Sequence, residues 1–227
     1  MHPKFFIVWI VSKILKFSLI PYLRAFAEVV FPKNLGANIV PSKKSRTEYL
    51  IGFFHSNLWL NSTSNKLIID NLEPKVIDGY VAELKKQAAI EKPIVLHMRL
   101  GDYEKEEKFG ILPTSYYQKA LELLTSVGFN GKIWIFTNDL EKSKEIFPKN
   151  FTSRARWIPN FSDSSVQVLE AMRLGSAYVI GNSTFSWWSA KLAREKSAKV
   201  VAPTPWFKCA ATHPDLLPEN WITINPW

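Results

Sequence analysis

The chain has 227 residues and a formal net charge of +9, and 47% of its residues are hydrophobic, including nine Trp and fifteen Phe. This apolar content excludes a disordered chain and is enough for one sizeable core. The lone cysteine, Cys209, excludes a disulfide within the chain, fits a reducing compartment, and is interpreted as a packing residue rather than a nucleophile.

The start of the chain is strongly basic. Residues 1–46 carry eight Lys or Arg and one acidic residue, a net charge of +7. We expect helices over 4–31 with a break at Pro21, followed by a polar connection over 32–46. Lysines interrupt the apolar positions, which argues against a transmembrane helix and a signal peptide. Two interpretations stay open, namely peripheral contact with an anionic membrane surface and a pair of core helices with solvated lysines.

The rest of the chain alternates between expected strands and helices. A strand is expected over 49–55 and a mostly helical stretch over 67–89. The further strands are expected over 94–98, 132–136, 156–158, 177–181 and 199–202. The further helices are expected over 113–127, 140–147, 164–174 and 184–195. This alternation predicts an α/β fold with a parallel sheet covered on both faces.

The first candidate site follows the strand at 94–98. Ile94, Val95 and Leu96 form a buried apolar run, and His97, Arg99 and Asp102 come where that strand should end. Ligands of open α/β sheets bind outside the carboxyl ends of the strands. The guanidinium of Arg99 suits a phosphate, so the implied ligand is an anion.

The second candidate site lies at a later strand-to-helix turn, in the run Gly181-Asn182-Ser183-Thr184-Phe185-Ser186-Trp187-Trp188. Small hydroxyl residues at a helix start combine free N–H groups, the helix dipole and side-chain donors, and this combination binds phosphate. The alternative is an ordinary N-cap followed by two Trp that pack the helix on the sheet.

These residues resemble the bacterial α-1,2-fucosyltransferases of glycosyltransferase family 11. The resemblance covers roughly residues 48–227 and rests on the His-x-Arg-x-Gly-Asp-Tyr context of Arg99, the run from Asn182 to Trp188, the segment 51–56, and the tail from Trp206 to Trp221. It implies a GT-B-like fold, with a Rossmann-type nucleotide-sugar domain over 91–227 and an incomplete, basic and mostly helical acceptor-side region over 1–90. It also implies inverting transfer of L-fucose from GDP-β-L-fucose to the 2-hydroxyl of a terminal galactoside.

The resemblance further implies roles for individual residues. Arg99 would hold the β-phosphate of the leaving GDP, and His97 and Asp102 would orient Arg99 or meet the nucleoside. Ser183, Thr184 and Ser186 would donate to the diphosphate from the helix start, with Asn182 beside them. Asp139 and Glu170 are weaker candidates for ribose or guanine contacts, and a surface role is as plausible for each. Asp102 is the nearest carboxylate for base catalysis, although a turn-shaping role is favoured. No metal and no cofactor are implied, since Arg and N–H donors can offset the charge of a diphosphate.

Two features depart from the family pattern. The family shows two adjacent arginines in the first motif, whereas Leu100 takes the second place here, so one phosphate contact would be weaker or would come from Arg154 or Arg156. The usual Gly-Gly-Leu-Gly-Asn-Gln loop of a first Rossmann-like half is absent, so we expect the chain to start midway through the acceptor-side domain. The main alternative is therefore a truncated, catalytically silent remnant that only binds GDP-sugar or glycan.

A rival of another class is a protein that binds nucleic acid or a membrane surface through residues 1–46. It predicts that binding is lost when that segment is removed, whereas the transferase interpretation places the essential residue at Arg99. We favour a glycan acceptor and no nucleic-acid partner. The expected location is the cytoplasm, with peripheral contact at the inner face of a bacterial membrane, in the synthesis of lipopolysaccharide or another surface glycan.

Overall fold

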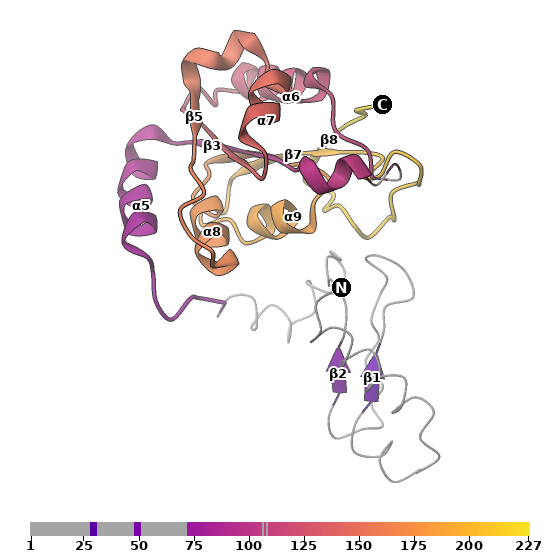
Figure 1. Cartoon of the computed structure of the whole chain (residues 1–227), viewed down its shortest axis with the longest axis horizontal. Helices are drawn as coiled ribbons and strands as arrows, with labels where there is room; N and C mark the ends of the chain where they lie inside the picture. Colours follow the sequence, from indigo (N-terminus) through magenta and orange to yellow (C-terminus); the bar gives the residue numbers. More distant parts are fainter. Residues whose placement is uncertain (1–27, 31–47, 51–71, 106, 108) are drawn as a thin grey trace.

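The computed structural model describes residues 28–30, 48–50, 72–105, 107 and 109–227 (Figure 1). Most of the helices expected over 4–31 therefore lie outside the described residues. The end of that range is a strand instead, β1 (Glu28–Val30), which pairs in parallel with β2 (Glu48–Leu50). The pairing brings part of the strand expected over 49–55 into a two-stranded sheet, and the rest of that strand lies outside the described residues.

A six-stranded parallel sheet forms the centre of the described domain. Its strands are β3 (Ile94–Met98), β4 (Ile133–Thr137), β5 (Ala155–Trp157), β6 (Ala177–Val179), β7 (Lys199–Pro203) and β8 (Ile222–Ile224). They lie in the order β5-β4-β3-β6-β7-β8, with every neighbouring pair parallel. The predicted α/β class with a Rossmann-type parallel sheet is confirmed. The sequence analysis missed β8.

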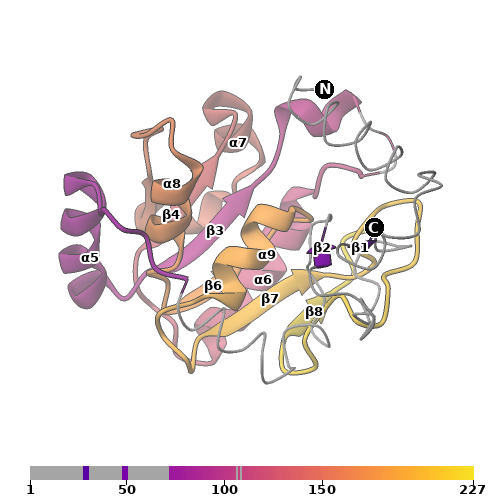
Figure 2. The same cartoon turned by 90° about the horizontal axis from the view of Figure 1, so that it is seen from below.

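Helices cover both faces of this sheet (Figure 2). On one face, α6 (Thr114–Ser126) packs against strand side chains such as Ile94 and Leu96, with α7 (Leu140–Ile146) and the 3-10 turn η2 (Lys149–Arg154) nearby. On the other face, α5 (Gly79–Glu91), α8 (Ser165–Met172) and α9 (Thr184–Lys191) pack against Val95 and Trp134. Successive side chains of β3 alternate between the two cores, as the period of a strand requires, and all five are buried.

The start of the helix expected over 67–89 was placed too early in the chain. Residues 72–78 are not helical, and α5 begins at Gly79. Pro74 lies in this stretch, and a proline disfavours the helical conformation of the residue before it. Asp78 then caps α5, since its side chain accepts a hydrogen bond from the Tyr80 N–H at 2.7 Å. The boundary predicted between 1–90 and 91–227 stays a prediction.

Candidate functional site

A cleft of about 670 Å³ lies at the carboxyl ends of β3 and β4, bounded by the loop that follows β5, by α8, and by the first turn of α9. Five of the predicted site residues line it together, namely His97, Arg99, Asp102, Ser183 and Thr184. The parallel strands explain this convergence, because their carboxyl ends share one edge of the sheet. The two candidate motifs, far apart in the sequence, therefore face one cleft.

Arg99 is held in place by a chain of hydrogen bonds. Its Nη2 donates to Oδ2 of Asp102 at 2.7 Å, and Oδ1 of Asp102 accepts from Nδ2 of Asn138 at 3.2 Å. Asn138, at the end of β4, also accepts from the Leu100 N–H at 2.8 Å and donates to the Leu100 carbonyl at 3.4 Å. It thereby fixes the turn 99–102 from a neighbouring strand.

Gly101 allows that turn to exit sharply. Its φ is +50°, and a Cβ at this position would lie 3.0 Å from Nδ2 of Asn138. A side chain there would strain the backbone and press on the amide that holds Asp102. Asn138 was not among the predicted site residues. The only sequence feature that could have indicated a site role for Asn138 is its position directly after a buried strand.

His97 lies beneath Arg99 and is buried, with 6% of its surface exposed. Burial, and secondarily the charge of Arg99, lower the pKa of His97 from 6.5 to about 3, so the imidazole is neutral at pH 7. Its buried Nδ1 has no hydrogen-bond partner among the described residues. His97 therefore contributes an uncharged imidazole to the wall of the cleft.

The turn between β6 and α9 forms the opposite wall. Ser183 is the N-cap of α9, and its hydroxyl accepts from the Phe185 N–H at 3.3 Å. Thr184 follows as the first helical residue and lines the cleft. Tyr103 joins the two motifs, because its hydroxyl donates to the Asn182 carbonyl at 3.2 Å. The free N–H groups and the positive end of the dipole of α9 make this wall suited to an anion.

Two predicted members of this turn are internal supports. The amide nitrogen of Asn182 donates to the carbonyls of Phe109 and Gly110 at 2.8 and 3.1 Å. The Ser186 hydroxyl donates to the carbonyls of Gly181 and Ser183. Neither residue is among those that line the cleft. Their polar groups are used to build the turn, as buried polar groups normally are.

Asp139 and Glu170 also lie outside the cleft lining. Asp139 is the N-cap of α7 and accepts from the Lys142 N–H at 3.1 Å. Glu170 is buried on α8, where it pairs with Arg173 and Arg194. The structure does not bring either carboxylate to the site at which a ribose or guanine contact was predicted.

Arg154 and Arg156, the residues considered as replacements for the family's second arginine, also lie away from the cleft. Leu100 is fully buried in the core, in the place where the family pattern has that arginine. Arg154 donates to the carbonyls of Phe129 and Gly131, and Arg156 pairs with Glu91 at 3.0 Å. Both guanidinium groups are occupied in loop and helix contacts, and neither lines the cleft. Of the two alternatives, a weaker phosphate contact or a contact from one of these arginines, the placement of both guanidinium groups favours the weaker contact.

The remaining wall was not predicted as part of the site. It comes from the loop after β5, with Pro159, Asn160, Phe161, Ser162 and Asp163, and from Ser165, Val168 and Met172 on one face of α8. The ring of Phe161 lies 4.7 Å from that of Tyr80, centroid to centroid. A mixed aromatic and polar wall of this kind can accept a planar base or a sugar.

The lining of the cleft combines the guanidinium group of Arg99 with the carboxylates of Asp102 and Asp163. Among the described residues that line it, Arg99 is the only Lys or Arg. No group of three or more His, Cys, Asp or Glu could hold a metal ion in the part of the chain that the structure describes. Within the same ranges, no helix combines the length and apolar character needed to cross a membrane.

Comparison with known proteins gives a family and two relatives. The family model described as Glycosyl transferase family 11 matches residues 39–225. The chain is 27% identical to an Escherichia coli alpha-1,2-colitosyltransferase over 97% of its own length and 75% of that relative. It is 29% identical to the Escherichia coli O-antigen biosynthesis glycosyltransferase WbnK over 57% of its own length, and it spans 43% of that protein.

Solved structures with some similarity were also found. A crystal structure of the NodZ alpha-1,6-fucosyltransferase soaked with GDP-fucose matches 70% of this chain and 55% of its own, with a TM-score of 0.45 and 14% identity. A crystal structure of POFUT1 in complex with GDP matches 83% of this chain and 78% of its own, with a TM-score of 0.36 and 12% identity.

Proposed function

The chain belongs to glycosyl transferase family 11, and we propose that it transfers L-fucose from GDP-β-L-fucose to the 2-hydroxyl of a terminal galactoside during synthesis of a bacterial surface glycan. The donor diphosphate binds between Arg99 and the start of α9. The acceptor is a glycan, and the reaction inverts the anomeric configuration. Family membership and the two Escherichia coli glycosyltransferases support transfer of a sugar, and the cleft supports an anionic donor.

The observation that carries the proposal is the fixed guanidinium of Arg99 in a cleft that also contains a helix start. Its bond to Asp102 orients the fork of donors before a ligand arrives. Loss of GDP from the anomeric carbon places growing negative charge on the β-phosphate. A preoriented cation and the N–H groups of Ser183 and Thr184 stabilise that charge more in the transition state than in the ground state.

Asp102 is better suited to orienting Arg99 than to removing a proton. Both of its carboxylate oxygens already accept hydrogen bonds, one from Arg99 and one from Asn138. A general base needs a free oxygen within reach of the acceptor hydroxyl. In the proposed mechanism Asp102 is therefore a positioning residue, and catalysis depends mainly on stabilisation of the leaving group without a metal.

The first test is titration calorimetry of the purified full chain with GDP and GDP-fucose, comparing wild type with Arg99→Ala. Lys86→Ala is the matched control, because it removes one positive charge from an exposed position on α5. We expect wild type and the control to bind alike. Arg99→Ala should lose about 10- to 100-fold in affinity, as expected for a hydrogen bond to a charged group. Equal binding by all three proteins would contradict the proposal.

Transfer itself needs a second measurement, with GDP-fucose and a terminal galactoside as the substrates. Product formation that depends on Arg99 would support the transferase. Donor binding without any product would support the silent remnant that only binds GDP-sugar. Peripheral contact with the inner face of the membrane is part of the same proposal, and sedimentation with anionic vesicles would test it.

A second candidate donor follows from one relative. The similarity to an alpha-1,2-colitosyltransferase extends over 97% of this chain. Colitose is L-fucose without its 3-hydroxyl group, so one cleft could accept either sugar. Comparison of kcat/KM for GDP-fucose and GDP-colitose decides between them. A site that hydrogen-bonds the 3-hydroxyl group should reject the deoxy sugar strongly, whereas an apolar wall at that position should not reject it.

A further inference from the structure

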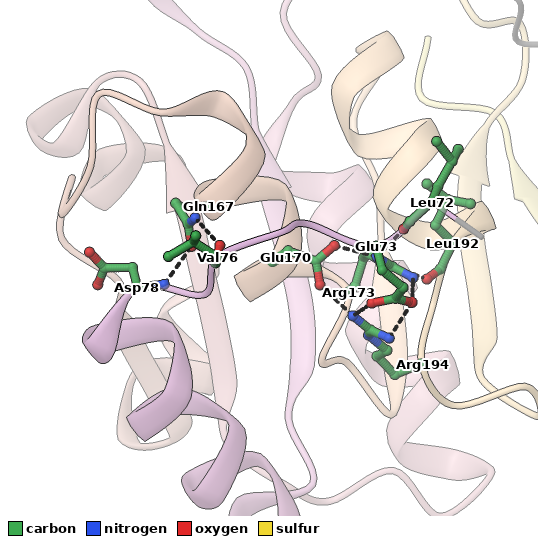
Figure 3. Close-up of polar contacts among 9 residues, drawn as sticks. All are labelled: Leu72, Glu73, Val76, Asp78, Gln167, Glu170, Arg173, Leu192 and Arg194. Atoms are coloured by element: carbon green, nitrogen blue, oxygen red, sulfur yellow. Dashed lines mark hydrogen bonds and ion pairs between the residues drawn. The ribbon is translucent and has the colours of Figure 1, made fainter. Parts of the chain in front are cut away.

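Residues 72–78, here called the strap, lie on the outer side of α8 and lead into α5 (Figure 3). Gln167 on α8 holds the strap at two points. Its amide nitrogen donates to the Val76 carbonyl at 2.8 Å, and its amide oxygen accepts from the Asp78 N–H at 2.8 Å. A side-chain amide that pairs with both backbone groups fixes the position of the strap along the helix.

A cluster of four charges holds the other end of the strap. Both oxygens of Glu73 accept from Arg194, at 2.6 and 2.5 Å, and one of them also pairs with Arg173 at 3.4 Å. The hydrogen bonds from Arg194 lower the pKa of Glu73, so its carboxylate is ionised at neutral pH. Glu170 pairs with both arginines. Two carboxylates and two guanidinium groups therefore balance one another where three segments meet (Figure 3).

Arg173 is the hub of this cluster, with only 7% of its side chain exposed. Its Nε donates to the Leu192 carbonyl at 2.7 Å, at the end of α9, and its Nη1 donates to the Leu72 carbonyl at 3.1 Å. The Arg194 N–H donates in turn to the Arg173 carbonyl at 2.9 Å. The end of α8, the end of α9 and the strap are thus joined through one guanidinium group.

Because of its helical period, α8 presents one face to the cleft and the opposite face to the strap. Ser165, Val168 and Met172 share the face that lines the cleft. Gln167, Glu170 and Arg173 lie on the opposite side and hold the strap. The wall of the cleft is therefore one helix thick, and the strap is fixed to its outer surface.

We propose that Glu73 is a positioning residue, and that the strap sets the placement of α8 and α9 and thereby the affinity of the cleft for a nucleoside diphosphate. This inference rests on the proposed function for its ligand. Loss of the Glu73 charge would loosen the wall without changing any group that lines the cleft.

The experiment compares wild type with Glu73→Gln and with Gln167→Ala, which weakens the strap from its other end. Glu83→Gln on α5 is the matched control, because it removes an exposed carboxylate whose partners, Lys86 at 3.3 Å and Gln87 at 3.4 Å, lie on the same helix. Hydrogen exchange of the ligand-free proteins is measured over 165–172 and 184–191, with α6 as an internal reference. GDP affinity and the temperature of unfolding are measured on the same proteins.

We expect Glu73→Gln to speed exchange in α8 and α9 but not in α6, and to weaken GDP binding about fivefold, in the range typical of coupled sites. If the unfolding temperature changes little while GDP affinity falls, Glu73 acts by positioning the two helices and not merely by stabilising the fold. In turnover, KM for the donor should rise with little change in kcat. Glu73→Gln in an Arg194→Gln background should have no further effect on affinity.

Unchanged exchange in α8 and α9 would overturn the inference, and so would accelerated exchange with unchanged GDP affinity. The outcomes also separate the two proposals. If wild type fails to bind GDP, the proposed donor is wrong, and the exchange measurement alone then decides whether the strap positions the two helices. If Arg99→Ala loses affinity and Glu73→Gln does not, the site stands and the strap inference fails.

Discussion

The two turns that face the cleft use their polar residues differently. The end of β3 and the turn after it place His97 and Arg99 in the lining of the cleft, and Asn138 at the end of β4 holds that turn. The turn before α9 uses Asn182 and Ser186 to hold its own backbone and presents Ser183 and Thr184. A run of polar residues at a strand end is therefore partly scaffold and partly site. Four substitutions would separate these two roles.

The largest expected effect is on stability, from Asn182→Ala in the second turn. The substitution removes both hydrogen bonds to the Phe109 and Gly110 carbonyls from a side chain that is almost fully buried. Loss of satisfied buried partners should cost about 2–3 kcal/mol of unfolding free energy. Urea denaturation measures this cost. Asn150→Ala at an exposed position in η2 is the control, and a loss no larger than the control's would show that Asn182 is not a support.

The next effect is a pH dependence of stability that arises from His97, near the end of β3. The folded-state pKa of His97 is about 3 against an ordinary value of 6.5, so the unfolded chain takes up a proton first as the pH falls. Stability is therefore lost progressively as the pH falls from about 6.5 toward 3. Between pH 6.5 and pH 5, above the range in which most carboxylates titrate, the loss should be about 1.6 kcal/mol.

Denaturation at several pH values checks this, with His97→Gln as the comparison. That variant should be less stable at pH 7 but should have a flatter pH dependence in the same window. An unchanged slope would assign the acid sensitivity to other groups. The second turn, from Asn182 to Ser186, contains no titratable side chain.

Much of the sheet could be predicted from the sequence, because buried parallel strands are short apolar runs bounded by polar turns. The strand at 94–98 was predicted with its observed bounds, and β4, β6 and β7 within one or two residues. β8 was missed because its three residues alternate in exposure and lack such a run. The helices α6 to α9 were found because their apolar periods and the Pro, Ser and Gly residues that flank them are local signals.

The cleft could be predicted only in part, since motifs locate turns but not the faces of helices. Arg99 and Ser183 follow strands that the sequence identifies. The wall from α8 depends on which face of that helix turns inward, and this is decided by tertiary packing. Glu170 was a weaker candidate for a ribose or guanine contact, yet it lies on the face of α8 that turns away from the cleft. The partnership of Asn138 with Leu100 spans 38 residues of sequence, and no local pattern indicates it.

A smaller effect is expected from Asn138→Ala, which removes the support that β4 gives to the first turn and also one side chain of the cleft lining. The change removes the bonds to Leu100 and Asp102 while Arg99 keeps its charge. Because the guanidinium is then less well oriented, GDP affinity should fall by about tenfold, equivalent to ~1.4 kcal/mol. Calorimetry measures this, and Asn138→Asp keeps the acceptor for the Leu100 N–H but places a carboxylate beside Asp102. Affinity equal to that of wild type in the Ala variant would mean that Asp102 alone orients Arg99.

The smallest effect is expected from Ser183→Ala, where scaffold and site overlap in one hydroxyl. That hydroxyl caps α9 through the Phe185 N–H, so its loss should cost about 1 kcal/mol of stability. It also lines the cleft, so GDP affinity should fall a few-fold as well. Ser183→Asp separates the two roles, because a carboxylate can cap the helix but repels a diphosphate. If the Asp variant recovers stability but loses further GDP affinity, the start of α9 is part of the anion site. If GDP affinity is unchanged in both variants, Ser183 has the capping role alone.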